Sequence, residues 1–144
     1  GSFMNYKELA EKAREIKADG ERFLAQYENE IVDFLREDAE DAESRLQKEI
    51  FFEFLDNLHG MCHLAEYMGL EVVKEGVLGL DSQGEMTLDG DVLPLMTEVE
   101  VKLYDKEEEQ EIWTRTYVAG AKKRYLVGID RSCPLIGMRA RMRG

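Results

Sequence analysis

The chain has 144 residues with 31 acidic and 19 basic side chains, and its formal net charge at pH 7 is −12. Hydrophobic residues make up 44% and charged residues 35%, which indicates a folded globular protein and excludes a disordered or fibrous chain. No apolar run approaches the roughly 20 residues of a membrane-spanning helix, and the sequence shows no secretory leader pattern, so we expect no membrane partner.

The cysteine content bears on the compartment. Cys62 and Cys133 lie far apart in the sequence, and two cysteines do not make a disulfide framework. We therefore expect a cytoplasmic protein, and its length suits one domain or two very small ones. Gly1-Ser2 has the form of a cloning remnant, and we expect the native chain to begin at Met4.

The first half of the chain has helical periodicity. Apolar side chains recur at steps of three and four residues over 9–35 and again over 46–68. Gly20 falls in a gap of the first stripe, which predicts a kink there. Gly69, followed by a leucine, predicts a glycine cap at the end of the second helix.

The capping residues and the polar segment between the stripes predict how the two helices connect. Asn5 is the expected N-cap of the first helix, and Asp38 or Asp41 that of the second. We predict a long helical hairpin over residues 1–69 that turns near 37–42. A single unbroken helix is the alternative, because no glycine or proline forces the turn.

After Gly69 the apolar pattern changes to a period of two. The predicted strands are separated by turn sequences rich in glycine and aspartate, and they cover residues 77–80, 85–88, 99–103, 112–118, 125–127 and 138–142. Five or six short antiparallel strands in about 70 residues predict a small β-barrel over residues 70–144. The expected fold class is therefore α+β.

Several runs in this half carry a resemblance to a known family. They are Gly76-Val77-Leu78, Trp113-Thr114-Arg115, Tyr125-Leu126-Val127 and the segment from Pro134 to Arg141. Over residues 72–143 the chain resembles a bacterial family of small SH3-like barrel domains associated with mobile genetic elements. An irregular turn at 132–135 lies where such barrels have a 3₁₀ turn. The resemblance implies an SH3-like β-barrel that binds peptides, proteins or nucleic acids, and it carries over no active site.

The charge is distributed unevenly along the chain. Residues 1–69 have a net charge of −9 and residues 70–112 one of −10, whereas residues 113–144 have a net charge of +7. A basic end on an acidic chain either pairs with the acidic strands inside the fold or binds an anionic partner. We favour internal pairing, because opposite charges commonly pair across strands.

Trp113, Arg115 and Tyr117 are the first candidate binding residues. They alternate along one predicted strand and therefore share one face of it. An aromatic–arginine–aromatic strip on the surface suits a peptide or a single-stranded nucleic acid. The alternative is that the two aromatic rings fill the barrel or pack on the helices.

Arg139 and Arg141 are the second pair of candidates. Together with Arg143 and the basic segment 122–124 they are placed to contact phosphate groups. The alternative is cross-strand pairing with carboxylates, for which the candidates are Glu98, Glu100 and the glutamate run at 107–109.

One cluster in the second helix has the spacing of a metal site. His59, His63 and Glu66, together with Asp56, fall on one helical face, and imidazoles at i and i+4 with a carboxylate are able to bind a transition metal. That face is opposite the apolar stripe, so ordinary side-chain pairing in solvent is the plainer interpretation. We expect no metal and no cofactor.

The motifs of common enzyme classes are absent from the sequence. There is no phosphate-binding glycine loop, no G-x-S-x-G elbow and no complete calcium loop. We therefore predict a non-enzymatic interaction or adaptor protein that binds a protein or peptide partner and self-associates through its helical hairpin. The alternatives are a nucleic-acid-associated accessory protein of a mobile element and a small metal-dependent enzyme.

Overall fold

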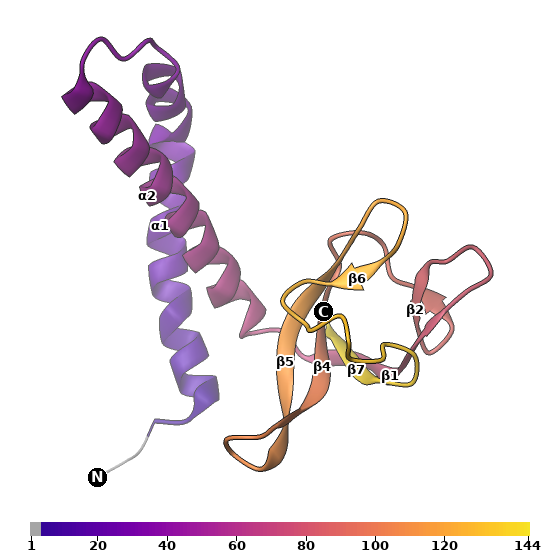
Figure 1. Cartoon of the computed structure of the whole chain (residues 1–144). Coiled ribbons are helices and arrows are strands. Elements are labelled where there is room, and N and C mark those ends of the chain that lie inside the picture. Colours follow the sequence, from indigo (N-terminus) through magenta and orange to yellow (C-terminus); the bar gives the residue numbers. More distant parts are fainter. Residues whose placement is uncertain (1–3) are drawn as a thin grey trace. The chain divides into compact units, whose positions relative to one another are not determined.

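The structure is a computed structural model that describes residues 4–144, so Gly1-Ser2 lies outside the described residues. The fold class is α+β, with two helices followed by a curled antiparallel sheet (Figure 1). The chain divides into two compact units between Leu70 and Glu71, one residue from the boundary we predicted. Within residues 4–144, no helix has the length and apolar character needed to cross a membrane.

The first unit is a helical hairpin, as predicted. Helix α1 covers Tyr6–Leu35 and helix α2 covers Ala42–Tyr67. The helices run antiparallel beside each other and are joined by a short loop (Figure 1). The loop occupies residues 36–41, where the turn was expected, and the single unbroken helix is excluded.

Each helix begins at a capping side chain. Asn5 Oδ1 accepts a hydrogen bond from the Glu8 backbone N–H at 2.9 Å. Asp41, rather than Asp38, caps α2, because its Oδ1 accepts the Ser44 N–H at 2.7 Å. This hydrogen bond from the backbone also holds the pKa of Asp41 below its usual value.

Of the two glycines singled out in the helical unit, Gly20 has a packing role and Gly69 is not the predicted glycine cap. Helix α1 continues through Gly20, which is buried against α2, and a Cβ atom added there would lie 2.9 Å from Cys62 Sγ. Gly20 therefore permits close packing of the two helices. Gly69 does not adopt the left-handed backbone of a glycine cap. Helix α2 ends in two tight turns, in which the Gly69 N–H donates to Glu66 O and the Leu70 N–H to Tyr67 O.

The second unit is a curled sheet of seven strands, more than the five or six predicted. Its strands are β1 Val72–Leu80, β2 Met86–Leu88, β3 Asp91–Val92, β4 Glu98–Asp105, β5 Gln110–Ala119, β6 Tyr125–Leu126 and β7 Arg139–Arg143. The additional strand is β3, which has two residues and lies where we expected a loop. All pairings are antiparallel, in the order β3-β2-β1-β7-β4-β5-β6.

The strand order brings distant parts of the chain together. The C-terminal strand β7 lies between β1 and β4, whereas β4 and β5 form a long hairpin (Figure 1). Strand β7 therefore sets its basic residues beside acidic residues of β1 and β4. In this register Arg141 is opposite Glu75 on one side and Glu100 on the other.

The core of the sheet unit lies on the concave inner face. Alternation along β4 and β5 sends the residues between the charged positions into this face. The buried cluster consists of Leu78, Met86, Leu88, Leu93, Val99, Val101, Val118, Leu126 and Ala140. One buried polar group, the Thr116 hydroxyl, donates to the Val127 carbonyl oxygen at 2.6 Å, so this hydroxyl is satisfied.

An ion pair links segments near the two ends of the curled sheet. Arg124, directly before β6, pairs with Glu85, directly before β2, through two bonds of 3.2 and 3.0 Å. The same guanidinium donates to the carbonyl oxygens of Gly120 and Ala121. Gly120 has a φ of +105°, and an added Cβ would lie 2.1 Å from Lys123 O, so only glycine fits this turn.

Candidate functional site

The predicted binding strip lies on the outer face of β5. Thr116 and Val118 are buried on the inner face, so Trp113, Arg115 and Tyr117 project outward together. Both aromatic side chains are half-buried and Arg115 is exposed. The two aromatic residues therefore do not fill the core of the sheet unit.

The ring of Trp113 is covered by basic side chains of its own unit. The Arg141 guanidinium carbon lies 4.1 Å from the ring centre, and the Lys102 ammonium lies 5.5 Å from it. Such cation–π contacts contribute about 0.5–2 kcal/mol each. The ring is already stacked in the described structure, and a base or peptide would have to displace Arg141 to use it.

The arginines of the basic end are paired with carboxylates across the strands. Glu100 Oε1 accepts from Arg141 Nε at 2.5 Å, and Glu100 Oε2 accepts from Arg143 Nε at 2.7 Å. Arg139 pairs with Glu75 at 3.1 Å. The internal pairing that we favoured is therefore present.

The remaining strip arginine is paired in the same way. Arg115 contacts Glu98 Oε2 at 3.0 Å across the β4–β5 hairpin. Glu98 and Glu100 were named as possible partners from the sequence, whereas Glu75 was missed. Glu75 was missed because we predicted the first strand to begin at residue 77, whereas β1 begins at Val72 and includes Glu75.

Replacing both Arg139 and Arg141 with alanine is expected to destabilise the sheet unit by about 2 kcal/mol, mostly through Arg141. The Arg139 pair is exposed and contributes little, whereas loss of Arg141 leaves Glu100 partly unpaired in a buried position. The check is thermal unfolding followed by Trp113 fluorescence, with a loss of roughly 8–16 °C in midpoint. An unchanged midpoint combined with lost nucleic-acid binding would show instead that these arginines form a binding surface.

The histidines of α2 do not come together as a metal site. His59 Nε2 lies 2.5 Å from Glu28 Oε1 of α1, and the His63 ring packs against Tyr67 at 6.3 Å between centroids. Glu66 lies further along the same helix. Within residues 4–144 no three metal-binding side chains are grouped closely enough to hold an ion. The geometry assigns His59 to a link between the two helices.

The helical hairpin has one large apolar face. At helical spacing, four apolar side chains fall in one sector of the first helix and six in one sector of the second. Each of the ten is between 37 and 71% exposed. We call this set the apolar face: Leu9, Ile16, Tyr27 and Phe34 of α1, with Ile50, Phe51, Phe54, Met61 and Leu64 of α2 and its C-cap residue Met68. This surface is much larger than the scattered apolar side chains of an ordinary protein surface.

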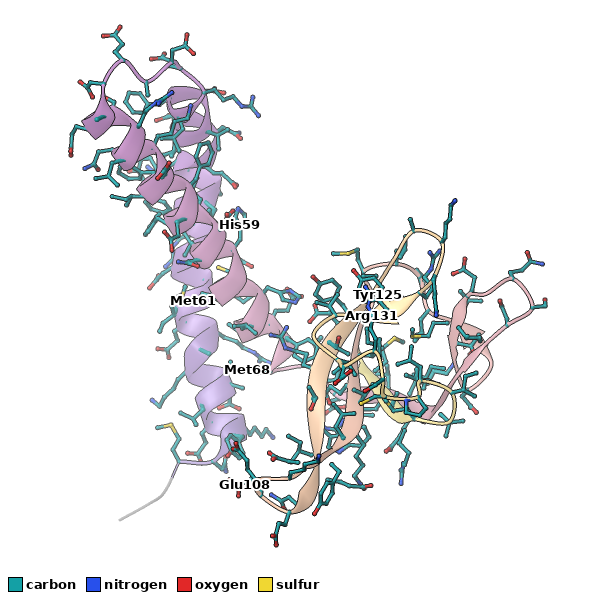
Figure 2. The ribbon with its side chains drawn as sticks, in the orientation of Figure 1. His59, Met61, Met68, Glu108, Tyr125 and Arg131 are labelled. Carbon is teal, nitrogen blue, oxygen red and sulfur yellow. The ribbon has the colours of Figure 1, made fainter. Side chains whose placement is uncertain are left out.

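Contacts between the helices show that the apolar face is continuous. Near the loop, Phe34 and Phe51 line the same hollow. In the middle, Phe23 packs edge-on against Phe54 with 5.8 Å between ring centres. Towards the other end, residues of both helices line a shared groove, among them Ile16, Asp56, Gly60, Met61, Leu64 and the C-cap residue Met68. Figure 2 labels Met61 of α2 and Met68 directly after it.

Comparison of the chain with protein-family models, with curated proteins and with solved structures gives no match.

Proposed function

We propose that this chain is a non-enzymatic interaction protein, in which the helical hairpin forms a homodimer and the curled sheet binds a partner. The observation that carries the first part is the apolar face of the hairpin. The buried residues of the hairpin are few and mostly small. They are Ala10, Gly20 and Leu35 of α1 with Leu55, Cys62 and Ala65 of α2. Most of the large apolar side chains of both helices remain open to a partner.

The size of the apolar face suits a stable interface. If each of its side chains has a total surface of roughly 200 Å², ten of them, about half exposed, present on the order of 1,000 Å². A standard interface buries about 800 Å² on each partner. The face also runs along the whole hairpin, for about 40 Å at the helical rise of 1.5 Å per residue.

A second copy of the chain is the occupant that this face fits best. Two hairpins related by a two-fold axis bury the same face against itself and form a four-helix bundle. Gly60 leaves an open space, with nothing within 4 Å of an added Cβ, in the groove beside Ile16 and Leu64. A side chain from the second hairpin fits into such a hole.

Sedimentation equilibrium of the full chain at micromolar concentration tests this proposal. The expected mass is twice the 16.6 kDa of one chain. Ile16→Asp and Leu64→Asp should each weaken the dimer at least tenfold, because both positions are half-exposed in one chain but become core positions in the bundle. Raising the salt concentration should strengthen the dimer, since each hairpin has a net charge of −9.

Ala25→Asp is the matched control. It introduces the same charge on an exposed position of α1 outside the apolar face and should leave the dimer intact. Far-UV circular dichroism must show equal helix content in all three variants. A mass of 16.6 kDa at every concentration, or a dimer that neither apolar-face variant weakens, would contradict the proposal.

We further propose that the sheet unit is an SH3-like barrel of the kind that the sequence resembles. Two features support this. The last strand lies between the first strand and the long β4–β5 hairpin, which curls the sheet into a half-barrel. A short turn then precedes β7, in which the Cys133 N–H donates to the Asp130 carbonyl oxygen at 3.0 Å. Partner binding is the common role of such small barrels, and here it rests on that analogy.

A further inference from the structure

A cavity of about 260 Å³ lies at the β6 end of the curled sheet. Its lining comes from the turn at 120–124, from β6 and from the loop at 129–135. Leu126, Ile129 and Leu135 form an apolar floor that is continuous with the core of the unit. The floor is therefore fixed by packing, and the cavity is part of the folded sheet.

Two basic side chains of the C-terminal segment that no carboxylate neutralises line this cavity. Of the eight basic side chains in residues 113–144, five are paired with glutamates: Arg115, Arg124, Arg139, Arg141 and Arg143. Lys122, Lys123 and Arg131 have no carboxylate within 4 Å among the residues that the structure describes. Lys123 and Arg131 both line the cavity.

Arg131 is held over an aromatic ring at the rim. Its guanidinium carbon lies 4.5 Å from the centre of the Tyr125 ring, and Figure 2 shows the two side chains together. This contact orients the guanidinium while its N–H groups remain available to an acceptor. Arg124 plays a different part, because Glu85 and two backbone carbonyls already hold its guanidinium and thereby fix the cavity wall.

One carboxylate also lines the cavity. Asp130 Oδ1 accepts bonds from the backbone N–H and the hydroxyl of Ser132, both at 2.9 Å, and these bonds hold the pKa of Asp130 below its usual value. Asp130 is therefore charged and occupied with its own turn. The lining still carries two cations without a carboxylate partner, Lys123 and Arg131, against this one anion.

We propose that this cavity binds an acidic peptide segment, with one apolar side chain on the floor of Ile129 and Leu135 above Leu126, and flanking carboxylates on Arg131 and Lys123. The volume of 260 Å³ lies just below the range of about 300–1,000 Å³ for small-molecule sites, which suits one or two side chains better than a whole nucleotide. Carboxylates bind arginine through paired, charge-assisted hydrogen bonds. A cationic rim around an apolar floor therefore selects a segment that combines both features.

This inference rests on the proposed role as an interaction protein and supplies the chemistry of its partner. The two are nevertheless separable, because dimerisation is measured on the hairpin by mass, whereas peptide binding is measured at the sheet. The probe is a fluorescein-labelled peptide of sequence Asp-Glu-Asp-Phe-Asp-Glu-Asp, titrated by fluorescence anisotropy into the full chain. The comparison peptide, Asn-Gln-Asn-Phe-Asn-Gln-Asn, keeps the phenylalanine and removes the charges.

The acidic peptide is expected to bind at least tenfold more tightly than the neutral one, and its affinity should fall as salt rises. Arg131→Gln and Lys123→Gln should each reduce its affinity several-fold, and amide NMR shifts on binding should map to residues 120–135. Arg139→Gln is the matched control, because it removes the same charge from an exposed position outside the cavity.

Three results would overturn the proposal. Equal binding of the acidic and neutral peptides would remove the role of the cations. Equal loss of affinity in Arg139→Gln and Arg131→Gln would show that only the overall charge matters. Tighter binding of a single-stranded oligonucleotide than of the acidic peptide would assign the cavity to nucleic acid. Thermal unfolding of each variant confirms that the sheet is folded in these measurements.

Discussion

Replacing Glu100 with glutamine is expected to destabilise the sheet unit by about 3 kcal/mol. The residue is 6% exposed, and its two oxygens separately hold Arg141 and Arg143. Glutamine keeps the shape and removes the charge, so two half-buried guanidinium groups lose their counter-charge together. Because removing one partner from a buried ion pair costs about 3–5 kcal/mol, and these arginines are partly hydrated, we expect the lower end.

Urea unfolding followed by the fluorescence of Trp113, the only tryptophan, measures this loss. Glu98→Gln is the control on the same strand. Its partner Arg115 is well exposed, so the control should lose less than about 1 kcal/mol. If both variants lose the same amount, burial of Glu100 does not set the strength of its pairs and the expectation is wrong.

Gly20→Val is expected to destabilise the helical hairpin by about 3 kcal/mol. An added Cβ lies 2.9 Å from Cys62 Sγ, closer than real Cβ contacts, and 3.1 Å from Leu58 Cδ1, so both side chains must shift to admit it. The two further methyl groups of valine cannot rotate away within a helix, so α1 and α2 must separate locally. The measurement is urea unfolding followed by far-UV circular dichroism, which reports mainly on the two helices.

Ala18→Val is the control for Gly20→Val, because it places the same side chain on an exposed position of α1. It should cost only the difference in helix propensity, roughly 0.5 kcal/mol. A double-mutant cycle of Gly20→Ala with Cys62→Ala tests the contact itself. Removing Cys62 Sγ makes room for the new methyl group, so the double variant should be more stable than the sum of the single effects predicts. If the stability effects of Gly20→Ala and Cys62→Ala simply add, the close approach of these two residues is contradicted.

The helical half could be predicted well because its signals are local. The apolar spacing and the capping side chains Asn5 and Asp41 act within one or two turns of the chain, and the hairpin follows from them. The role of Gly20 could not be predicted from its neighbours in the sequence. Whether a glycine inside a helix bends it or admits a neighbour depends on the residue of α2 that lies opposite, here Cys62.

The sheet half could be predicted less completely for the same reason. The strand β3 has two residues, too few to show alternation, and it exists because β2 lies beside it. The pairing of Arg139 with Glu75 depends on the register between the first and last strands. The role of Arg131 depends on Tyr125 and on a cavity that forms only when three separate segments meet.

The ion pair between Arg124 and Glu85 has a consequence for the motions of the half-barrel. Because β2 and β6 do not pair with each other and the Arg124–Glu85 ion pair links the segments before them, we expect this side of the half-barrel to open without breaking any strand pairing. Such opening would expose the short edges β3 and β6 and the buried residues Met86 and Leu126 beneath them. Arg124, which forms this ion pair, also lines the cavity described above. A bound peptide would therefore keep this side of the half-barrel shut and slow hydrogen exchange in β2 and β6.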